Sequence, residues 1–259
     1  MRVPVVQHTT RRQRARRRRA LWTGGELLVT AGLVLLLLVV HQLWWTNREA
    51  RRGAERKVEA LEREWGDGVT GKDDDSGTSA PSATPRPRSG TSTRTRQQTT
   101  AAAQSRPSWS QAYAILTIPR LGLRVPVAEG VSKQDVLNKG YVGHYRGTGQ
   151  PGQAGNFALA GHRNTHGEPF RYINRLRAKD VLEVETKTAT YTYAVDETLP
   201  QTSARDSGVV RPIPRSIVEP RYGYSEPGYY ITLTTCTPEY TSRYRLVVWG
   251  KLVSMRPRS

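Results

Sequence analysis

An apolar segment of 19 residues, 27–45, constrains how this chain can fold more than any other feature. Four small or polar residues interrupt it, namely Thr30, Gly32, His41 and Gln42. A helix rises about 1.5 Å per residue, so the segment spans roughly 28 Å, close to the ~30 Å of a hydrocarbon core. A cleaved signal peptide is the alternative, but the apolar core is long and no small-x-small cleavage site follows it. We therefore predict a retained transmembrane anchor over residues 21–45.

The charges around this segment predict its orientation. The formal net charge of the chain is +18, and an arginine-rich block at residues 11–19 directly precedes the segment. Eight arginines precede the segment and five lysines or arginines follow it closely. The positive-inside rule therefore predicts residues 1–20 as a cytoplasmic tail and the bulk of the chain outside the cell. The sequence has no zinc-finger, RNP or heptad pattern, so we predict no nucleic-acid partner.

Composition divides the rest of the chain into three parts. Residues 46–66 are rich in charge, and Leu61 and Trp65 are among their few large apolar residues. This composition predicts a charged juxtamembrane helix that serves as a solvated stalk. Residues 67–110 are rich in Gly, Ser, Thr and Pro. Such a segment buries too little apolar surface to offset its ordering entropy, so we predict a disordered linker. Residues 111–259 are predicted to form one folded catalytic domain.

Short β-branched and aromatic runs alternate with turns throughout this domain, which indicates strands. Eight strands are expected near residues 112–118, 123–127, 140–144, 156–160, 181–186, 189–195, 229–234 and 244–253. Short helices are expected at 132–137 and 169–176. Many short strands with little helix predict a mainly β fold, a closed barrel-like domain.

Cys236 is the only cysteine in the chain. In an extracellular domain it cannot form an intramolecular disulfide, so it is either a buried bystander or a working thiol. A nucleophilic thiol needs a nearby base, and His162 is a candidate because it, like Cys236, follows an apolar strand. An arginine could stabilise an oxyanion beside the thiol. Arg243 and Arg245 lie on one face of the last expected strand, and either fits.

The residues around these positions resemble the motifs of sortases, a family of cysteine transpeptidases. Residues 232–236, TLTTC, are similar to the active-site TLxTC motif. Gly161-His162 resembles the histidine motif, and residues 245–248 resemble the final arginine-bearing strand. The resemblance covers about residues 111–254 in the family's order. Residues 142–145 and 155–163 are most similar to class E, the actinobacterial housekeeping type.

The resemblance implies an eight-stranded sortase barrel and a reaction that requires no metal or organic cofactor. It implies that the Cys236 thiolate attacks the substrate carbonyl. His162 protonates the departing amine and later deprotonates the incoming one. The arginine that stabilises the oxyanion is then Arg245, because it directly precedes the apolar triplet, with Arg243 as the alternative.

The resemblance also implies substrates and partners. Tyr145 matches the tyrosine tied to a Leu-Ala-x-Thr-Gly sorting signal, and His144, Thr234 and Thr235 are further candidates for substrate binding. A hydrogen-bonded structural role is the alternative for His144. The expected partners are secreted proteins with a C-terminal sorting signal, a lipid-linked peptidoglycan precursor that supplies the acceptor amine, and the membrane. A pilin-polymerising sortase, a hydrolase that trims, and a tethered binding module with an inert Cys236 remain alternatives.

Overall fold

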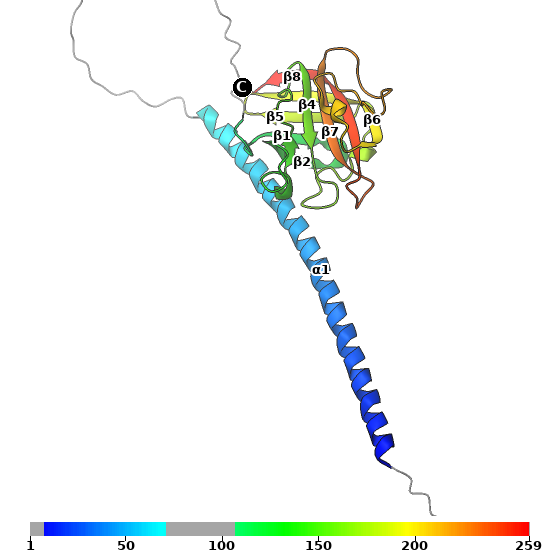
Figure 1. The fold of residues 1–259 in the computed structure, drawn as a ribbon. Coiled ribbons are helices and arrows are strands. Elements are labelled where there is room, and N and C mark those ends of the chain that lie inside the picture. Colours follow the sequence, from blue (N-terminus) through cyan, green and yellow to red (C-terminus); the bar gives the residue numbers. More distant parts are fainter. Residues whose placement is uncertain (1–7, 71–106, 259) are drawn as a thin grey trace, which may run out of the picture.

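The structure is a computed structural model that describes residues 8–70 and 107–258 (Figure 1). It contains one long helix, α1 (His8–Thr70), and a β-barrel beside it. Most of the predicted linker, 67–110, lies outside the described residues, as do residues 1–7 of the predicted tail. Because α1 is continuous, no break marks the boundaries predicted at 20 and 45, and these boundaries stay predictions.

The barrel confirms the predicted fold class. Its strands are β1 (Ala112–Ile118), β2 (Leu123–Glu129), β3 (Val142–His144), β4 (Gly155–Ala160), β5 (Val181–Thr186), β6 (Ala189–Ser203), β7 (Tyr229–Thr237) and β8 (Tyr244–Pro257). They close in the order β1-β2-β3-β4-β7-β8-β6-β5. Closure leaves no unpaired sheet edge between these strands, which protects them from pairing with other chains.

The centre of the barrel is apolar and well filled. Side chains of β4 and β7 such as Phe157, Leu159 and Leu233 are buried in one cluster with side chains from the other strands. β4 and β7 pair in parallel, and consecutive residues of both strands are buried, which is typical of parallel strands that are covered on both faces. The two strands therefore end at the same edge of the barrel.

Two expectations about the secondary structure of the domain are wrong. The segments 132–137 and 169–176 form turns and single 3-10 turns, at Leu137–Lys139 and Ile173–Arg175, instead of α-helices. Gly140 ends the first of them with a φ of 81°. β6 runs to Ser203, eight residues beyond the expected end at 195, because it keeps pairing with β8 through three register shifts.

The N-terminal part of α1 contains the predicted anchor. Within the described residues, α1 is the one helix that is long and apolar enough to cross a membrane, and its most apolar stretch is not buried against the barrel. Figure 1 shows this part, in blue, extending well away from the barrel.

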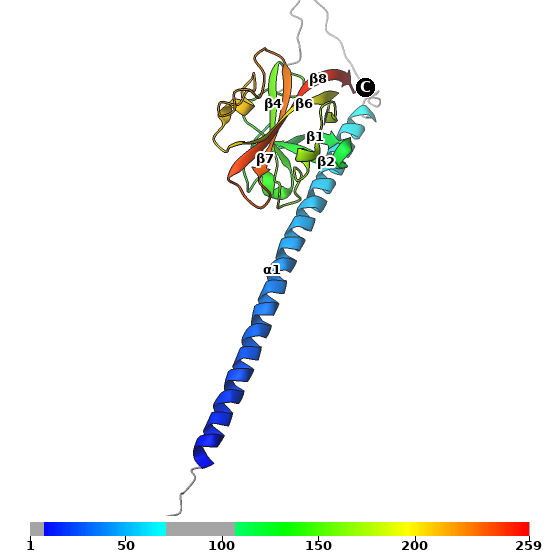
Figure 2. The same cartoon turned by 90° about the vertical axis from the view of Figure 1, so that its right-hand side faces the viewer.

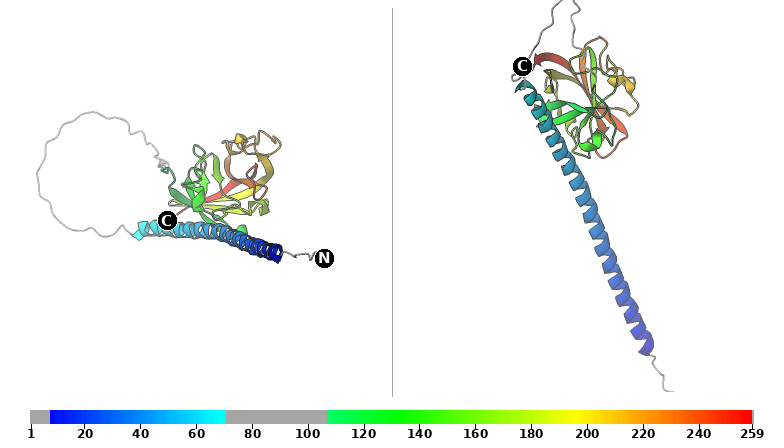
Figure 3. Two further views of the ribbon diagram at one scale, coloured as in Figure 1. Left: turned by 60° about the horizontal axis from the view of Figure 1, so that its bottom comes forward. Right: turned by 90° about the vertical axis from the view of Figure 1, so that its left-hand side faces the viewer.

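The C-terminal part of α1 corrects the prediction for residues 46–66. The segment is helical, but the solvated stalk is wrong, because one face packs on the barrel (Figures 2 and 3). Its buried residues recur at intervals of three or four, namely Ala50, Ala54, Val58, Leu61 and Trp65. Several of them pack against Ile115, Ala128 and Val136 of the barrel domain. An ion pair of 2.7 Å between Arg124 and Glu62 lies at the edge of this contact.

Replacement of Leu61 by Ala tests this packing. Leu61 is 2% exposed, so the truncation should weaken docking of α1 by about 2–5 kcal/mol through lost burial and a residual cavity. Hydrogen–deuterium exchange of the full chain in detergent should then show faster exchange of amides 46–66. Glu64→Ala is the matched control, because Glu64 lies on the exposed face of the same turn. Equal exchange in both variants would contradict the docking.

Candidate active site

The parallel pairing of β4 and β7 brings the predicted catalytic residues together. Ala160 at the end of β4 is level with Thr234 of β7, so His162, two residues further, comes level with Cys236. On the other side of β7, Arg245 of β8 is the register partner of Cys236. Side chains of directly opposed strand residues lie on the same face of the sheet, with Cβ atoms about 4.5–5.5 Å apart. Residues from three strand ends, with His162 distant in the sequence from the other two, thus converge at Cys236.

A cavity of about 680 Å³ lies at this point, and both His162 and Cys236 line it. Cys236 is partly exposed, so its thiol is accessible from the cavity. Further lining residues come from the loop after His162, from the loop before β8 and from α1. The predicted pair of thiol and imidazole is therefore present in one cleft.

The guanidinium of Arg245 is bound to backbone oxygens at the start of β8 and in the loop before it. It donates hydrogen bonds to the backbone oxygens of Ser242 and Tyr244, at 2.9 and 3.0 Å. Arg243 lies outside β8, and its guanidinium carbon lies over the Tyr244 ring, 5.2 Å from the ring centroid. Only Arg245 is in register with Cys236, so the backbone geometry favours Arg245 as the arginine of the site.

His162 is held in a defined orientation. Its Nε2 lies 2.9 Å from Oδ1 of Asn138, a residue that sequence reasoning did not identify. Donation from Nε2–H to that oxygen leaves Nδ1 as the free base of the neutral ring. Burial, with added repulsion from His166 and Lys133, lowers the pKa of His162 to about 4. The imidazole is therefore neutral at neutral pH, with the lone pair of Nδ1 free.

Arg163 is a second residue that sequence reasoning did not identify as functional. Its buried guanidinium donates to the backbone oxygen of Cys236 at 3.1 Å and to Oγ1 of Thr237 at 2.9 Å. This residue directly follows His162, so it ties the histidine loop to the cysteine strand. The position of Arg163 beside a candidate catalytic histidine could have suggested a role in the site. Its partner, Cys236, lies 73 residues away in the sequence, so the contact itself could not be predicted.

The candidate substrate-binding residues occupy different environments. The Tyr145 hydroxyl lies 3.0 Å from Oγ1 of Thr234. Thr234 and Thr235 are buried, and their hydroxyls donate to the backbone oxygens of Leu159 and Gly161 at 3.1 and 2.8 Å. The two threonines therefore join β7 to β4 and to the loop that follows β4. A direct contact with substrate stays a prediction for all three residues.

His144 has a structural environment. It is fully buried, and Nδ1 lies 2.7 Å from Oε2 of Glu129 and 2.9 Å from the Tyr113 hydroxyl. Nε2 lies 2.9 Å from Oγ1 of Thr148. Burial lowers the pKa of His144, although Glu129 acts in the opposite direction. His144 has no exposed surface in this structure, and a contact with substrate stays a prediction for it.

Metal ligation has no obvious place in the described part of the chain. Among residues 8–70 and 107–258, no group of three or more His, Cys, Asp or Glu side chains is arranged to hold a metal ion. The cleft instead combines one thiol, the imidazoles of His162 and His166, and the cations Lys133 and Arg163. This set is suited to attack on a carbonyl and stabilisation of the resulting oxyanion.

Comparisons with known proteins agree with this chemistry. The sequence model described as the sortase domain matches residues 116–253. Sortase SrtE1 of Streptomyces coelicolor is 41% identical over 223 residues, which cover 84% of this chain and 53% of that protein. The chain thus spans about half the length of that relative. Sortase SrtE2 of the same organism is 36% identical over 82% of this chain and 73% of its own length.

The solved structures that resemble this chain include sortases E. The crystal structure of Sortase E1 from Streptomyces coelicolor with a tripeptide in the active site is 50% identical, with a TM-score of 0.55. The match covers 59% of this chain and 94% of that one. Sortase E from Streptomyces avermitilis is 39% identical with a TM-score of 0.51, over 58% of this chain and 93% of that one.

The replacement Lys133→Met should raise the pKa of His162 from its value of about 4, because it removes a positive charge that opposes protonation of the ring. The measurement is an NMR titration that follows the imidazole resonance absent from His162→Gln. Lys139→Met is the control, since Lys139 is an exposed lysine six residues further along the chain that does not contribute to the shift of the His162 pKa. An unchanged or lower pKa in Lys133→Met would contradict the electrostatic account.

Proposed function

Because the chain belongs to the sortase family of cysteine transpeptidases, and its named relatives are sortases E, we propose that it anchors secreted proteins to the cell wall. In this proposal it cleaves a Leu-Ala-x-Thr-Gly sorting signal between Thr and Gly and transfers the Thr carbonyl to an amine of a cell-wall precursor. The observation that carries the proposal is the meeting of Cys236, His162 and Arg245 at the common edge of β4, β7 and β8.

The first half of the reaction forms an acyl-enzyme. The thiol of Cys236 transfers its proton to the neutral imidazole of His162, and the thiolate attacks the Thr carbonyl of the signal. The C=O electron pair moves to oxygen and gives a tetrahedral oxyanion. When this intermediate collapses, the C–N bond to Gly breaks, and the imidazolium gives its proton to the departing amine. A thioester between Thr and Cys236 remains.

The second half releases the thioester to an amine. The neutral His162 removes a proton from the incoming amine as it attacks the carbonyl. Collapse of the second tetrahedral intermediate expels the thiolate, which takes the proton back from the imidazolium. Transfer to the lipid-linked peptidoglycan precursor gives a new amide bond. Transfer to water gives a trimmed product instead.

Arg245 is proposed to stabilise the oxyanion in both halves. The hydrogen bonds to Ser242 and Tyr244 hold its guanidinium at the loop that lines the cavity. A rotation of the side chain toward its register partner Cys236 would bring an N–H donor to the developing charge. Tyr145 is proposed to contact the alanine position of the signal.

The proposed location follows from the helix and its charges. The apolar part of α1 supplies a single-pass anchor, and the arginines at 11–19 favour a cytoplasmic N-terminus. The barrel then lies outside the cell at the membrane surface. Both the exported substrate and a lipid-linked acceptor are available there.

The full chain in detergent should cut a Leu-Ala-x-Thr-Gly peptide between Thr and Gly. It should cut a Leu-Pro-x-Thr-Gly peptide less efficiently, and an added glycine amine should appear in the product by mass spectrometry. Cys236→Ala should abolish both cleavage and ligation, because no acyl-enzyme can form. Cleavage that yields only the hydrolysed product at every amine concentration would replace the transpeptidase with a trimming hydrolase.

Arg245→Met should lower kcat by about 10²–10³, the usual effect of removing one oxyanion donor. Arg243→Met is the matched control, because Arg243 is a neighbouring cation that lacks the register contact with Cys236. Its kcat should stay close to that of the parent protein. The reverse pattern of rates would make Arg243 the oxyanion donor.

A further inference from the structure

The anchor helix itself lines the catalytic cavity. Trp44, Thr46 and Asn47 of α1 contribute to the walls of the same 680 Å³ cavity as His162 and Cys236. These three residues lie at the end of the apolar segment 27–45 or directly after it. The side of the cleft that they form is therefore the side nearest to the membrane.

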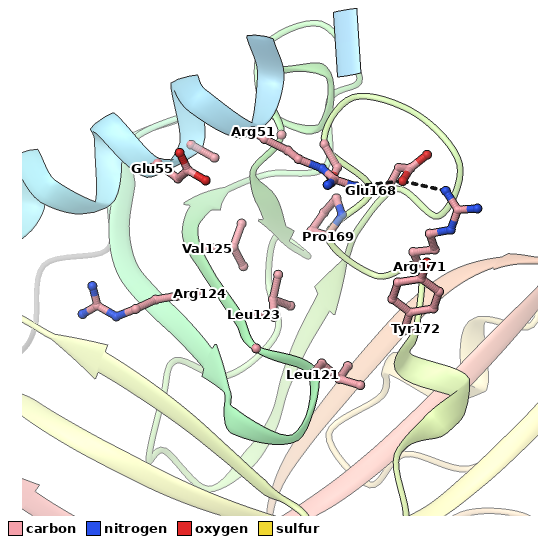
Figure 4. Close-up of a pocket in the computed structure, with 14 residues that line it drawn as sticks. Arg51, Glu55, Leu121, Leu123, Arg124, Val125, Glu168, Pro169, Arg171 and Tyr172 are labelled. Atoms are coloured by element: carbon pink, nitrogen blue, oxygen red, sulfur yellow. Dashed lines mark hydrogen bonds and ion pairs between the residues drawn. The ribbon is translucent and has the colours of Figure 1, made fainter. Parts of the chain in front are cut away.

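The same part of α1 holds the loop that follows His162. The backbone N–H of Gly167 donates to Oδ1 of Asn47 at 2.6 Å, and Nε of Arg51 donates to the Gly167 oxygen at 3.0 Å. The Arg51 guanidinium also pairs with Glu168 at 3.0 Å. Figure 4 shows Arg51 reaching from α1 to Glu168, which also binds Arg171 at 2.8 Å. Glu168 is thus held from both sides.

This loop has a conformation that requires support. Three consecutive residues, His166, Gly167 and Glu168, have φ values of 51°, 85° and 53°. The left-handed region is unfavourable for residues with a Cβ, so two of the three positions carry a steric cost. The hydrogen bonds from Asn47 and Arg51 fall on the centre of this stretch. They compensate for that cost only while α1 is docked.

The loop in turn orients the catalytic histidine. The ring of His166 stacks on the ring of His162 with centroids 5.3 Å apart. The backbone N–H of Phe170 donates to the His162 oxygen at 3.0 Å, which closes the loop on itself. Displacement of residues 166–168 would therefore change the position of the His162 imidazole relative to Cys236.

We propose that residues 44–51 of α1 are part of the active site. Trp44 and Thr46 form the membrane-side wall of the substrate cleft, and Asn47 and Arg51 are positioning residues that act on His162 through the loop 166–168. The wall is a direct inference from the cavity, whereas the effect on catalysis rests on the proposed function. A barrel without α1 lacks both the wall and the support for the loop.

The wall is tested first, by a measurement that needs no enzymatic activity. Cys236 is the only cysteine, so a bimane label attached to the full chain in nanodiscs reports from the cleft alone. Tryptophan quenches bimane at contact distance, so Trp44→Phe should increase the fluorescence. Trp45→Phe is the matched control, because Trp45 borders a different cavity with Asn138 and Tyr141 and should leave the signal unchanged. Equal signals from the two variants would overturn the wall, whether or not the protein is a transpeptidase.

The positioning role is tested by peptide cleavage with the same preparation. Asn47→Leu should lower kcat/KM by about 10- to 100-fold, since small displacements of a catalytic group have effects of this size. Asn47→Asp keeps an oxygen acceptor for the Gly167 N–H and should retain most of the activity. Arg51→Ala should behave like Asn47→Leu.

Arg56→Ala serves as the control for the helix itself. Arg56 pairs with Glu49 on the exposed side of α1, so its loss should leave kcat/KM unchanged. The pKa of His162, followed by NMR, should change in Asn47→Leu and stay constant in Arg56→Ala. If Asn47→Leu keeps both its kcat/KM and its His162 pKa, the positioning role is wrong. An inactive parent protein would instead contradict the proposed function and leave the fluorescence result intact.

Discussion

The parallel pairing of β4 with β7 is the constraint on which the site depends. It fixes the level of His162 relative to Cys236, since Ala160 and Thr234 are register partners. Polar contacts at the end of the pair then maintain this alignment. Thr235 binds the Gly161 oxygen, and Arg163 binds the Cys236 oxygen. Because a shift of one residue would move every side chain to the other face, these contacts protect the register on which the chemistry relies.

The electrostatics of the cleft favour a particular order of events. Lys133 and His166 oppose a positive charge on His162, and burial adds to their effect, so the resting imidazole is neutral. Lys133 lines the cavity, and in the proposed reaction its positive charge favours the negative charge that develops on the substrate oxygen. A resting ion pair between thiolate and imidazolium is disfavoured in this arrangement. In the proposed reaction, proton transfer from Cys236 to His162 is then coupled to the arrival of a carbonyl that can accept the charge.

The barrel was largely predictable from the sequence, whereas the contacts around the site were not. The bounds of β1 and β5 agree with the expected ranges, because β-branched runs between turn residues are a local signal. Asn138 and Arg163 act on partners 24 and 73 residues away, which no local pattern encodes. The docked face of α1 was missed for another reason. Ala50, Ala54 and Val58 are small, so charged residues dominate the composition of the segment and conceal its apolar face. In the structure, the small size of these buried side chains lets the helix approach the barrel closely.

Docking of α1 changes what the membrane anchor does. A helix that only tethers the barrel would leave its orientation free, whereas a helix that packs through Leu61 and Trp65 fixes the barrel relative to the apolar segment of α1. The contacts are modest, but residues 71–106 join the two parts covalently. Docking is therefore intramolecular, and the high effective concentration lets a small interface persist. Since the docked helix continues directly from the apolar segment to Asn47 and Arg51, the position of the bilayer and the geometry of His162 are set by the same rigid element.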